Sequence, residues 1–172
     1  CFYALEQNRA DQKRYPAVNP IDSYSKYLEY PEIREHLSEK VKPGWVEMVE
    51  KTKNIIRKGK DANDQINILG DDGVPMSYHE LFWKSELVDF VILQQDAFDD
   101  IDALCPIERQ KYMLELVMGI CERDFTFEDF EECRNYFKEL INALRQMNYS
   151  EFKSERFYEY QEKLNNLLSN GK

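Results

Sequence analysis

Apolar residues recur every three or four positions along most of the chain, which is the spacing of an amphipathic helix. Pro43 occupies the place of a first helical residue, and a long apolar stripe follows it. The stripe consists of Trp45, Met48, Val49, Thr52, Ile55 and Ile56. Gly59 is expected to end or bend this helix, because glycine destabilises a helix interior. A short helix is expected next, with Gly70 as its C-cap.

Further helices are predicted in the second half of the chain. Ser77 and Glu80 have the spacing of a capping box, and Thr126 and Asp129 are spaced for another cap. The inward-facing positions are Leu81, Val88, Val91 and Ile92, then Met113, Val117, Ile120 and Cys121, then Phe130, Cys133, Phe137, Leu140, Ile141 and Leu144, and finally Phe157, Tyr160, Leu164, Leu167 and Leu168. No stretch alternates convincingly as a strand does. The pattern predicts an all-α fold, a helical bundle of about six or seven helices preceded by an extended proline-rich loop.

The proline-rich loop is the segment that helical periodicity does not explain. Pro16 and Pro20 each fix their own φ and push the preceding residue toward extended backbone. Tyr15 and Asn19 are therefore expected to follow a stiff, non-helical path. A stiff loop that displays the Tyr15 ring suits stacking on a flat ligand. A packed loop whose tyrosine only fills a gap is the alternative that the residues leave open.

Charge limits the classes of partner. The chain has 33 Asp and Glu against 23 Lys and Arg, a formal net charge of −10. Such a surface repels phosphate backbones, so no nucleic-acid partner is expected. No apolar run approaches the length that crosses a bilayer, and no signal peptide opens the chain. No direct membrane insertion is expected.

The sequence offers little catalytic chemistry. Its four cysteines form no C-x-x-C pair, and its two histidines, His36 and His79, do not complete a zinc-binding pattern. Buried free thiols are expected instead. No histidine stands near a plausible nucleophile, and no G-x-x-x-x-G-K-[ST] phosphate loop occurs. We therefore predict no metal site, no catalytic residue and no ATP hydrolysis by this chain alone.

Three segments, in chain order, carry a family resemblance. Residues 2–5 read FYAL, residues 15–25 read YPAVNPIDSYS, and residues 93–106 read LQQDAFDDIDALCP. They are similar to F-W-A-L-D, to Y/F-P-A-(V/I)-N/D-x-(L/I)-x-S-(Y/x)-S and to L-Q-Q-N-A-F-D-x-(V/I)-D-x-(Y/x)-C-P. The chain thus resembles the C-terminal part of the catalytic A subunit of vacuolar/archaeal-type (V/A-type) rotary ATPases. By this resemblance, residues 1–22 are an N-terminal helix and proline-rich connector from the nucleotide-binding domain. Residues 23–172 are then the C-terminal helical bundle domain.

The resemblance implies a nucleotide contact. In the family, one aromatic residue of the Y/F-P-A loop and one of the A-F-D stretch hold the adenine ring. The matching residues here are Tyr15 and Phe98, with Ala97 as a backbone neighbour; a core role between helices is the alternative for Phe98. The implied cofactors are ATP or ADP with Mg²⁺ in the full-length subunit. No tight binding by the fragment is expected.

A second implied site is a loop that presses on the central rotor in the sister family, the mitochondrial and bacterial rotary ATPases. The matching residues are Asp71, Asp72, Gly73, Val74 and Pro75, of which only the two aspartates keep the acidic character. Torque transfer through shape rather than charge is therefore the expectation, and an ordinary surface turn is the alternative. The implied partners are B subunits in an alternating hexameric head and the central stalk subunits. The implied location is cytoplasmic, peripheral to the membrane.

A different class of protein also fits these residues. The chain contains 11 Tyr and 10 Phe, and large exposed aromatic patches are typical of protein interfaces. A free-standing acidic helical adaptor, or protein-interaction module, is therefore the alternative function.

Overall fold

The computed structural model describes residues 1–170. Its elements in chain order are α1 (Gln7–Asp11), the 3₁₀ turn η1 (Lys26–Glu29), α2 (Pro31–Lys40), α3 (Trp45–Leu69), the 3₁₀ turn η2 (Asp71–Gly73), α4 (Met76–Val88), the π-helical turn η3 (Asp89–Leu93), α5 (Ile107–Cys121), α6 (Phe130–Asn148) and α7 (Glu155–Asn170). Only two isolated β-bridges, and no strand, occur among these residues. The predicted all-α bundle is confirmed.

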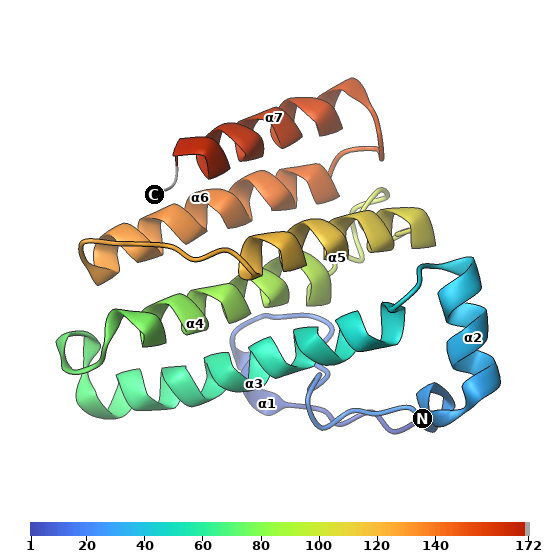
Figure 1. Cartoon of the computed structure of the whole chain (residues 1–172), viewed down its shortest axis with the longest axis horizontal. Helices are drawn as coiled ribbons and strands as arrows, with labels where there is room; N and C mark the ends of the chain where they lie inside the picture. The colour runs from blue at the N-terminus through green and yellow to red at the C-terminus, as the bar shows by residue number, and fades with distance from the viewer. Residues whose placement is uncertain (171–172) are drawn as a thin grey trace.

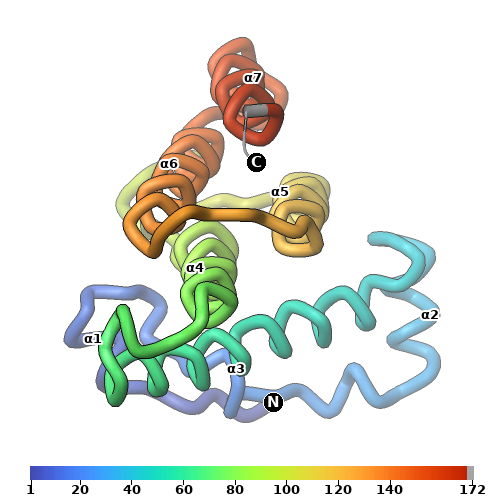
Figure 2. The backbone as a smooth tube through the Cα atoms, turned by 60° about the vertical axis from the view of Figure 1, so that its left-hand side comes forward, coloured from blue at the N-terminus to red at the C-terminus, as the bar shows by residue number. Residues whose placement is uncertain are grey.

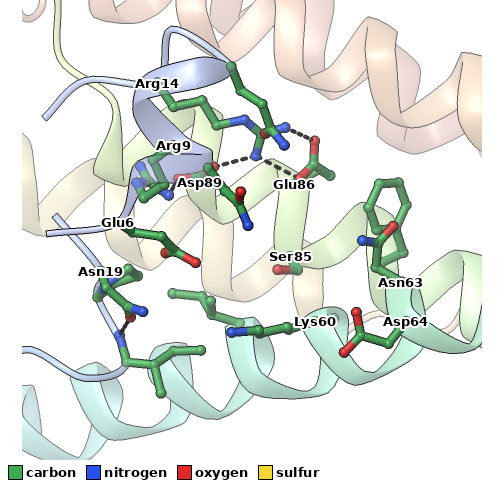
Figure 3. Close-up of a pocket in the computed structure, with 17 residues that line it drawn as sticks. Glu6, Arg9, Arg14, Asn19, Lys60, Asn63, Asp64, Ser85, Glu86 and Asp89 are labelled. Atoms are coloured by element: carbon green, nitrogen blue, oxygen red, sulfur yellow. Dashed lines mark hydrogen bonds and ion pairs between the residues drawn. The ribbon is translucent and has the colours of Figure 1, made fainter. Parts of the chain in front are cut away.

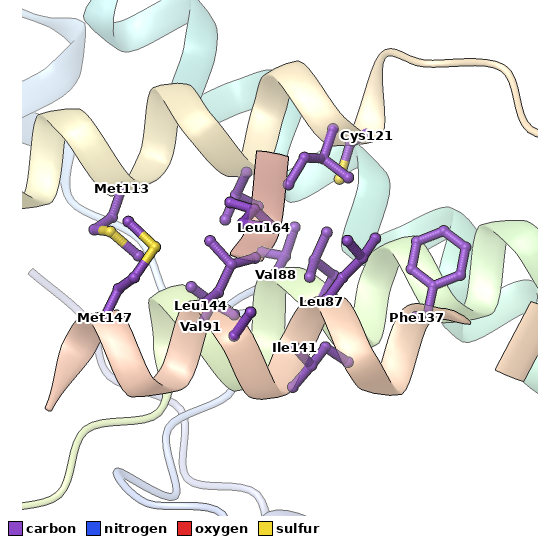
Figure 4. Close-up of a cluster of buried hydrophobic side chains, with 14 of the residues drawn as sticks. Leu87, Val88, Val91, Met113, Cys121, Phe137, Ile141, Leu144, Met147 and Leu164 are labelled. Atoms are coloured by element: carbon purple, nitrogen blue, oxygen red, sulfur yellow. The ribbon is translucent and has the colours of Figure 1, made fainter. Parts of the chain in front are cut away.

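Five long helices lie roughly alongside one another, from α3 at one edge to α7 at the other (Figure 1). A view turned by 60° shows α3, α4, α6 and α7 in succession, with α5 to one side of α4 and α6 and with α2 at the end of α3 (Figure 2). The apolar core lies between α4, α5, α6 and α7, and its buried side chains include Leu87, Val88, Met113, Val117, Phe137, Leu144 and Leu164 (Figure 4). The predicted face of α5 is confirmed, since all four of its residues are buried.

Helix α3 continues through the glycine that was expected to interrupt it. It is a single helix of 25 residues, so the predicted end at Gly59 is wrong, and the short helix expected before Gly70 is the last part of α3. A Cβ placed on Gly59 would lie 2.1 Å from the Cβ of Ser85 in α4. Gly59 is thus needed where the two helices approach closely, and this packing outweighs the roughly 1 kcal/mol that glycine costs a helix. The cap at Gly70 is confirmed, with φ at 81°.

Two helices begin elsewhere than predicted. Helix α4 begins at Met76, with Pro75 as its N-cap and no side-chain capping bond, so Ser77 lies inside the helix and forms no capping box. Helix α3 begins two residues after Pro43, because Gly44 takes a left-handed conformation, φ 76°, as its N-cap. A cap does precede α6, but the N-cap is Asp129, whose side chain accepts the N–H of Glu132 at 2.8 Å, and the predicted pairing of Thr126 with Asp129 is wrong.

The N-terminal segment follows an irregular path against α3 and α4 (Figures 1 and 2). Bridges pair Phe2 with Tyr24 and Leu5 with Val18. Asn19 is buried, and its side-chain oxygen accepts the N–H groups of residues 21 and 22 at 2.8 and 3.0 Å. These bonds fix the non-helical path expected for the connector. In the part of the chain that the structure describes, no helix is long and apolar enough to cross a membrane.

Candidate functional site

Tyr15, Ala97 and Phe98 line one open hollow of about 510 Å³. The ring of Phe98 is fully exposed (100%) and Tyr15 is 56% exposed. The fold thus brings together the predicted aromatic positions from the connector and from the loop that follows η3. The core position that was the alternative for Phe98 is excluded by its exposure.

Carboxylates fix the loop that carries Phe98. Asp96 accepts the N–H of Phe98 at 2.9 Å, while Asp99 accepts those of Ile101 and Asp102 at 3.0 and 2.8 Å. Asp102 in turn accepts the N–H of Asp96 at 2.7 Å. Asx turns of this kind set the backbone without using the side chains between them. The loop therefore holds the backbone of Phe98 and leaves its ring in solvent.

Arg109, in α5, is hydrogen-bonded to this loop. Its buried guanidinium donates to the carbonyl oxygen of Ile101 at 3.1 Å and to the carbonyl oxygen of Asn148 in α6. It also lies 3.7 Å from the carboxylate of Asp102. Burial raises the pKa of Asp102, and the N–H of Asp96 and the charge of Arg109 only partly offset that effect. Asp102 thus lines the hollow, and its carboxylate holds the backbone of the loop in place.

A partly buried ion-pair cluster joins the connector to α4 and η3. Arg14 donates to both carboxylate oxygens of Glu86, each at 2.8 Å, and to Asp89 at 2.5 Å. Arg9 lies 2.7 Å from the other oxygen of Asp89. Figure 3 shows both arginines reaching from the N-terminal segment to the two acids, beside a smaller hollow of about 310 Å³. We call Arg9, Arg14, Glu86 and Asp89 the arginine seam.

The arginine seam was missed by sequence reasoning. Burial alone would lower the pKa of Arg14, but the hydrogen bonds and charges of Glu86 and Asp89 outweigh it and raise that pKa. The available signal was Asp89, an acid inside the apolar run from Leu87 to Leu93. A carboxylate in such a run is rarely buried unless it is paired.

Phe90 lies between the arginine seam and the hollow. The guanidinium of Arg14 lies 4.8 Å from the centroid of the Phe90 ring, and that of Arg145 lies 5.9 Å from it. Arg145 also lies 6.0 Å from the ring of Tyr149 and donates to its hydroxyl at 3.3 Å. Phe90, Arg145 and Tyr149 all line the hollow. Its wall is therefore aromatic with a cationic edge, which favours planar, electron-rich ligands.

The loop matched to the rotor contact lies at the turn between α3 and α4 (Figure 1), and none of its residues lines the hollow. Asp71, Asp72, Gly73 and Pro75 are exposed and Val74 is half-buried. Nε2 of His79 donates to the carbonyl oxygen of Asp71 at 2.9 Å, so α4 holds the turn in place. The acidic side chains themselves stay at the surface.

All four cysteines are free thiols, as expected, but only Cys121 and Cys133 are buried, while Cys1 is exposed and Cys105 is half-buried. Burial raises the pKa of each of these two to about 12. Among residues 1–170, no group of His, Cys, Asp and Glu could hold a metal ion. The residues that line the hollow offer aromatic faces and hydrogen-bonding groups.

Comparison with known proteins agrees with these features. The family model described as the C-terminal domain of V and A type ATP synthase matches residues 34–124. The chain is 37% identical over 167 residues to the V-type ATP synthase alpha chain of Chlamydia abortus and to that of Chlamydia pneumoniae. Each match covers 97% of this chain and 28% of the relative, so the chain spans about a quarter of those relatives' length. This chain belongs to the family of C-terminal domains of V and A type ATP synthases.

Proposed function

We propose that this chain acts as the C-terminal domain of the catalytic A subunit of a V/A-type rotary ATPase. In that role it completes an adenine pocket and passes movement to the central rotor. The observation that carries the proposal is the meeting of Tyr15 and Phe98 on one hollow, both with exposed rings. The family membership favours this role over a free-standing adaptor.

The hollow suits an adenine ring for physical reasons. Stacking a base on an aromatic side chain contributes about 1–3 kcal/mol, and two such faces border the same space. Ala97 adds no bulk between them, and Gln95 ties the two sides together by donating its N–H to the carbonyl oxygen of Tyr15 at 3.1 Å. An exposed aromatic ring on a backbone fixed this firmly is typical of a binding surface.

ATP hydrolysis and its Mg²⁺ would belong to the whole subunit. Phosphoryl transfer needs a phosphate cradle, a lysine and a hydroxyl that holds the metal, and the sequence of this chain has no such loop. The domain would contribute the base contact, with B subunits and central stalk subunits as its neighbours in a hexameric head peripheral to the membrane. An isolated domain would bind nucleotide only at millimolar concentrations or higher.

Helix α4 would connect the two sites. The acidic turn precedes its first residue, Met76, and η3 continues directly from its last, Val88, toward the hollow. Its 13 residues span about 20 Å. A push on the turn would therefore reach the adenine pocket along a single helix.

The adenine contact is tested by Phe98→Ala in the full-length subunit within its assembled complex. We expect the KM for ATP to rise about tenfold or more from the lost stack, with little change in kcat. Tyr158→Ala is a matched control, because Tyr158 is another exposed aromatic residue (51%) but lies on α7 outside the hollow. An unchanged KM in Phe98→Ala would contradict the adenine contact.

The rotor contact is tested separately by inserting several glycines after Gly73. The added flexibility should uncouple ATP hydrolysis from rotation, because a slack turn transmits no force. Rotation and hydrolysis are measured on the same reconstituted head. Normal coupling in this variant would reject the role of the turn and leave the adenine contact standing.

A further inference from the structure

The arginine seam includes the sequence neighbour of Tyr15, the aromatic residue that the connector contributes to the hollow. Arg14 is the neighbour of Tyr15 in sequence, and its guanidinium is held by three hydrogen bonds to Glu86 and Asp89. Arg9, at the other side of the turn, pairs with the same Asp89 and accepts the backbone N–H of Arg14 at 2.8 Å. The short turn from Arg9 to Arg14 is thus fixed at both ends to one carboxylate.

The backbone of Asp89 contacts the segment that forms the other side of the hollow. Its carbonyl oxygen accepts the N–H of Gln94 at 2.9 Å, at the point where η3 gives way to the loop that carries Phe98. The next residue, Phe90, lines the hollow with its ring under Arg14. One residue, 5% exposed, therefore contacts both segments that present the aromatic faces.

Stability alone is a weak explanation for such a cluster. Buried ion pairs often contribute no more than well-packed apolar residues of the same size, because desolvation offsets the attraction between the charges. Such ion pairs do fix the relative orientation of the two segments that carry them, since a forked guanidinium fits a carboxylate in few orientations. A cluster that fixes orientation is useful where the next residue in the chain must contact a ligand.

We propose that Asp89, assisted by Glu86, is a positioning residue that sets Tyr15 against the adenine ring through Arg9 and Arg14. The inference rests on the proposed function, because it assumes that Tyr15 contacts the base. Asp89 itself does not touch the nucleotide in this arrangement. Its loss should weaken nucleotide binding without altering the chemical step.

The test uses Asp89→Asn in the full-length subunit within its assembled complex, with ATP as the substrate. We expect the KM for ATP to rise about tenfold and kcat to stay within about twofold, because a displaced contact costs binding rather than chemistry. Glu80→Gln is the matched control: Glu80 also forms an ion pair on α4, with Lys84 at 2.6 Å, but lies outside the hollow. That variant should leave the KM unchanged.

A double-mutant cycle separates positioning from general support. If Asp89 acts through Tyr15, Asp89→Asn should raise the KM about tenfold in the parent and less than about twofold in Tyr15→Ala. Equal effects in both backgrounds would overturn the proposal, as would an unchanged KM in Asp89→Asn alone. If Asp89→Asn does not assemble, Glu86→Gln, which leaves the charge of Asp89 in place, enters the same cycle with the same criterion.

The proposed function fails on a different observation. If Phe98→Ala and Tyr15→Ala both leave the KM for ATP unchanged, the hollow does not bind adenine and the positioning role falls with it. If those two variants raise the KM and the Asp89 and Glu86 variants do not, the adenine contact stands and the positioning role is rejected.

Discussion

The apolar core between α4 and α7 and the arginine seam at the other side of α4 hold the molecule together by different means. The core buries leucine, valine and phenylalanine side chains, and the largest of them, Phe137, has no exposed surface. The seam pairs two arginines with two acids at oxygen–nitrogen distances of 2.5 to 2.8 Å. Arg9 and Asp89 are buried, whereas Arg14 and Glu86 are half-buried. Helix α4 contributes to both, Leu87 and Val88 to the core and Glu86 and Asp89 to the seam.

The contrast separates stability from orientation. Apolar burial is roughly proportional to area and has no preferred direction, so the core decides whether the helices stay together. Charged hydrogen bonds are directional, so the seam decides how the connector lies on them. Loss of a core residue should destabilise the whole bundle, whereas loss of a seam residue should release only the connector.

The strongest challenge to this contrast is a cavity in the core. Phe137→Ala is expected to lower the free energy of unfolding by about 3–5 kcal/mol, because transfer energy and packing are lost together. Urea unfolding followed by circular dichroism measures the change. Ile68→Ala is the control, since Ile68 is 74% exposed on α3 and should change stability little. A loss below about 1 kcal/mol in Phe137→Ala would contradict the central role of this core.

A seam variant sharpens the contrast. Glu86→Gln should lower the free energy of local opening in the connector by about 1.5–3 kcal/mol, the usual range for hydrogen bonds to charged groups. Amide hydrogen exchange at residues 9–19 should speed up, while exchange in α5 to α7 should not change. Faster exchange throughout the bundle would mean that seam and core are one cooperative unit.

The contact between α3 and α4 gives a third comparison, using two glycines. Gly59→Ala should destabilise the chain by about 1–3 kcal/mol through overpacking, because the new Cβ would meet Ser85. Gly119→Ala, in α5, has no atom within 4 Å of its new Cβ and should stabilise by up to about 1 kcal/mol. Thermal unfolding of both variants measures the difference. Equal effects would mean that α3 and α4 can separate without cost.

A pH dependence that belongs to the core is also expected, and it appears only above about pH 9. The raised pKa values of Cys121 and Cys133 mean that the folded protein keeps two protons that the unfolded chain begins to release near pH 9. The unfolded state then binds fewer protons, so stability falls as pH rises from about 9 toward 12. The slope should be smaller in Cys121→Ala/Cys133→Ala than in the parent. Identical slopes would show that these thiols are not held in an apolar environment.

How well the sequence predicted each region depends on how far apart in sequence the interacting residues lie. The apolar faces of α5 and α6 depend on spacing within one helix, so periodicity was enough to place Val117 and Phe137. The passage of α3 through Gly59 depends on Ser85, which lies 26 positions later, and no local pattern shows that contact. The arginine seam joins residues more than 70 positions apart, and only Asp89 in its apolar run hinted at it. Tyr15 and Phe98 came from family resemblance, since exposed aromatics leave no periodic signal.

The close approach of Gly59 to Ser85 also constrains how α3 and α4 can move. Gly59 lies near the middle of α3, but Ser85 lies three residues before the end of α4, where η3 begins. The close contact therefore holds α4 against α3 at the end nearest the hollow and not at the acidic turn. A side chain at position 59 would push this end of α4 away from α3, so the absence of one side chain helps to fix where η3 starts.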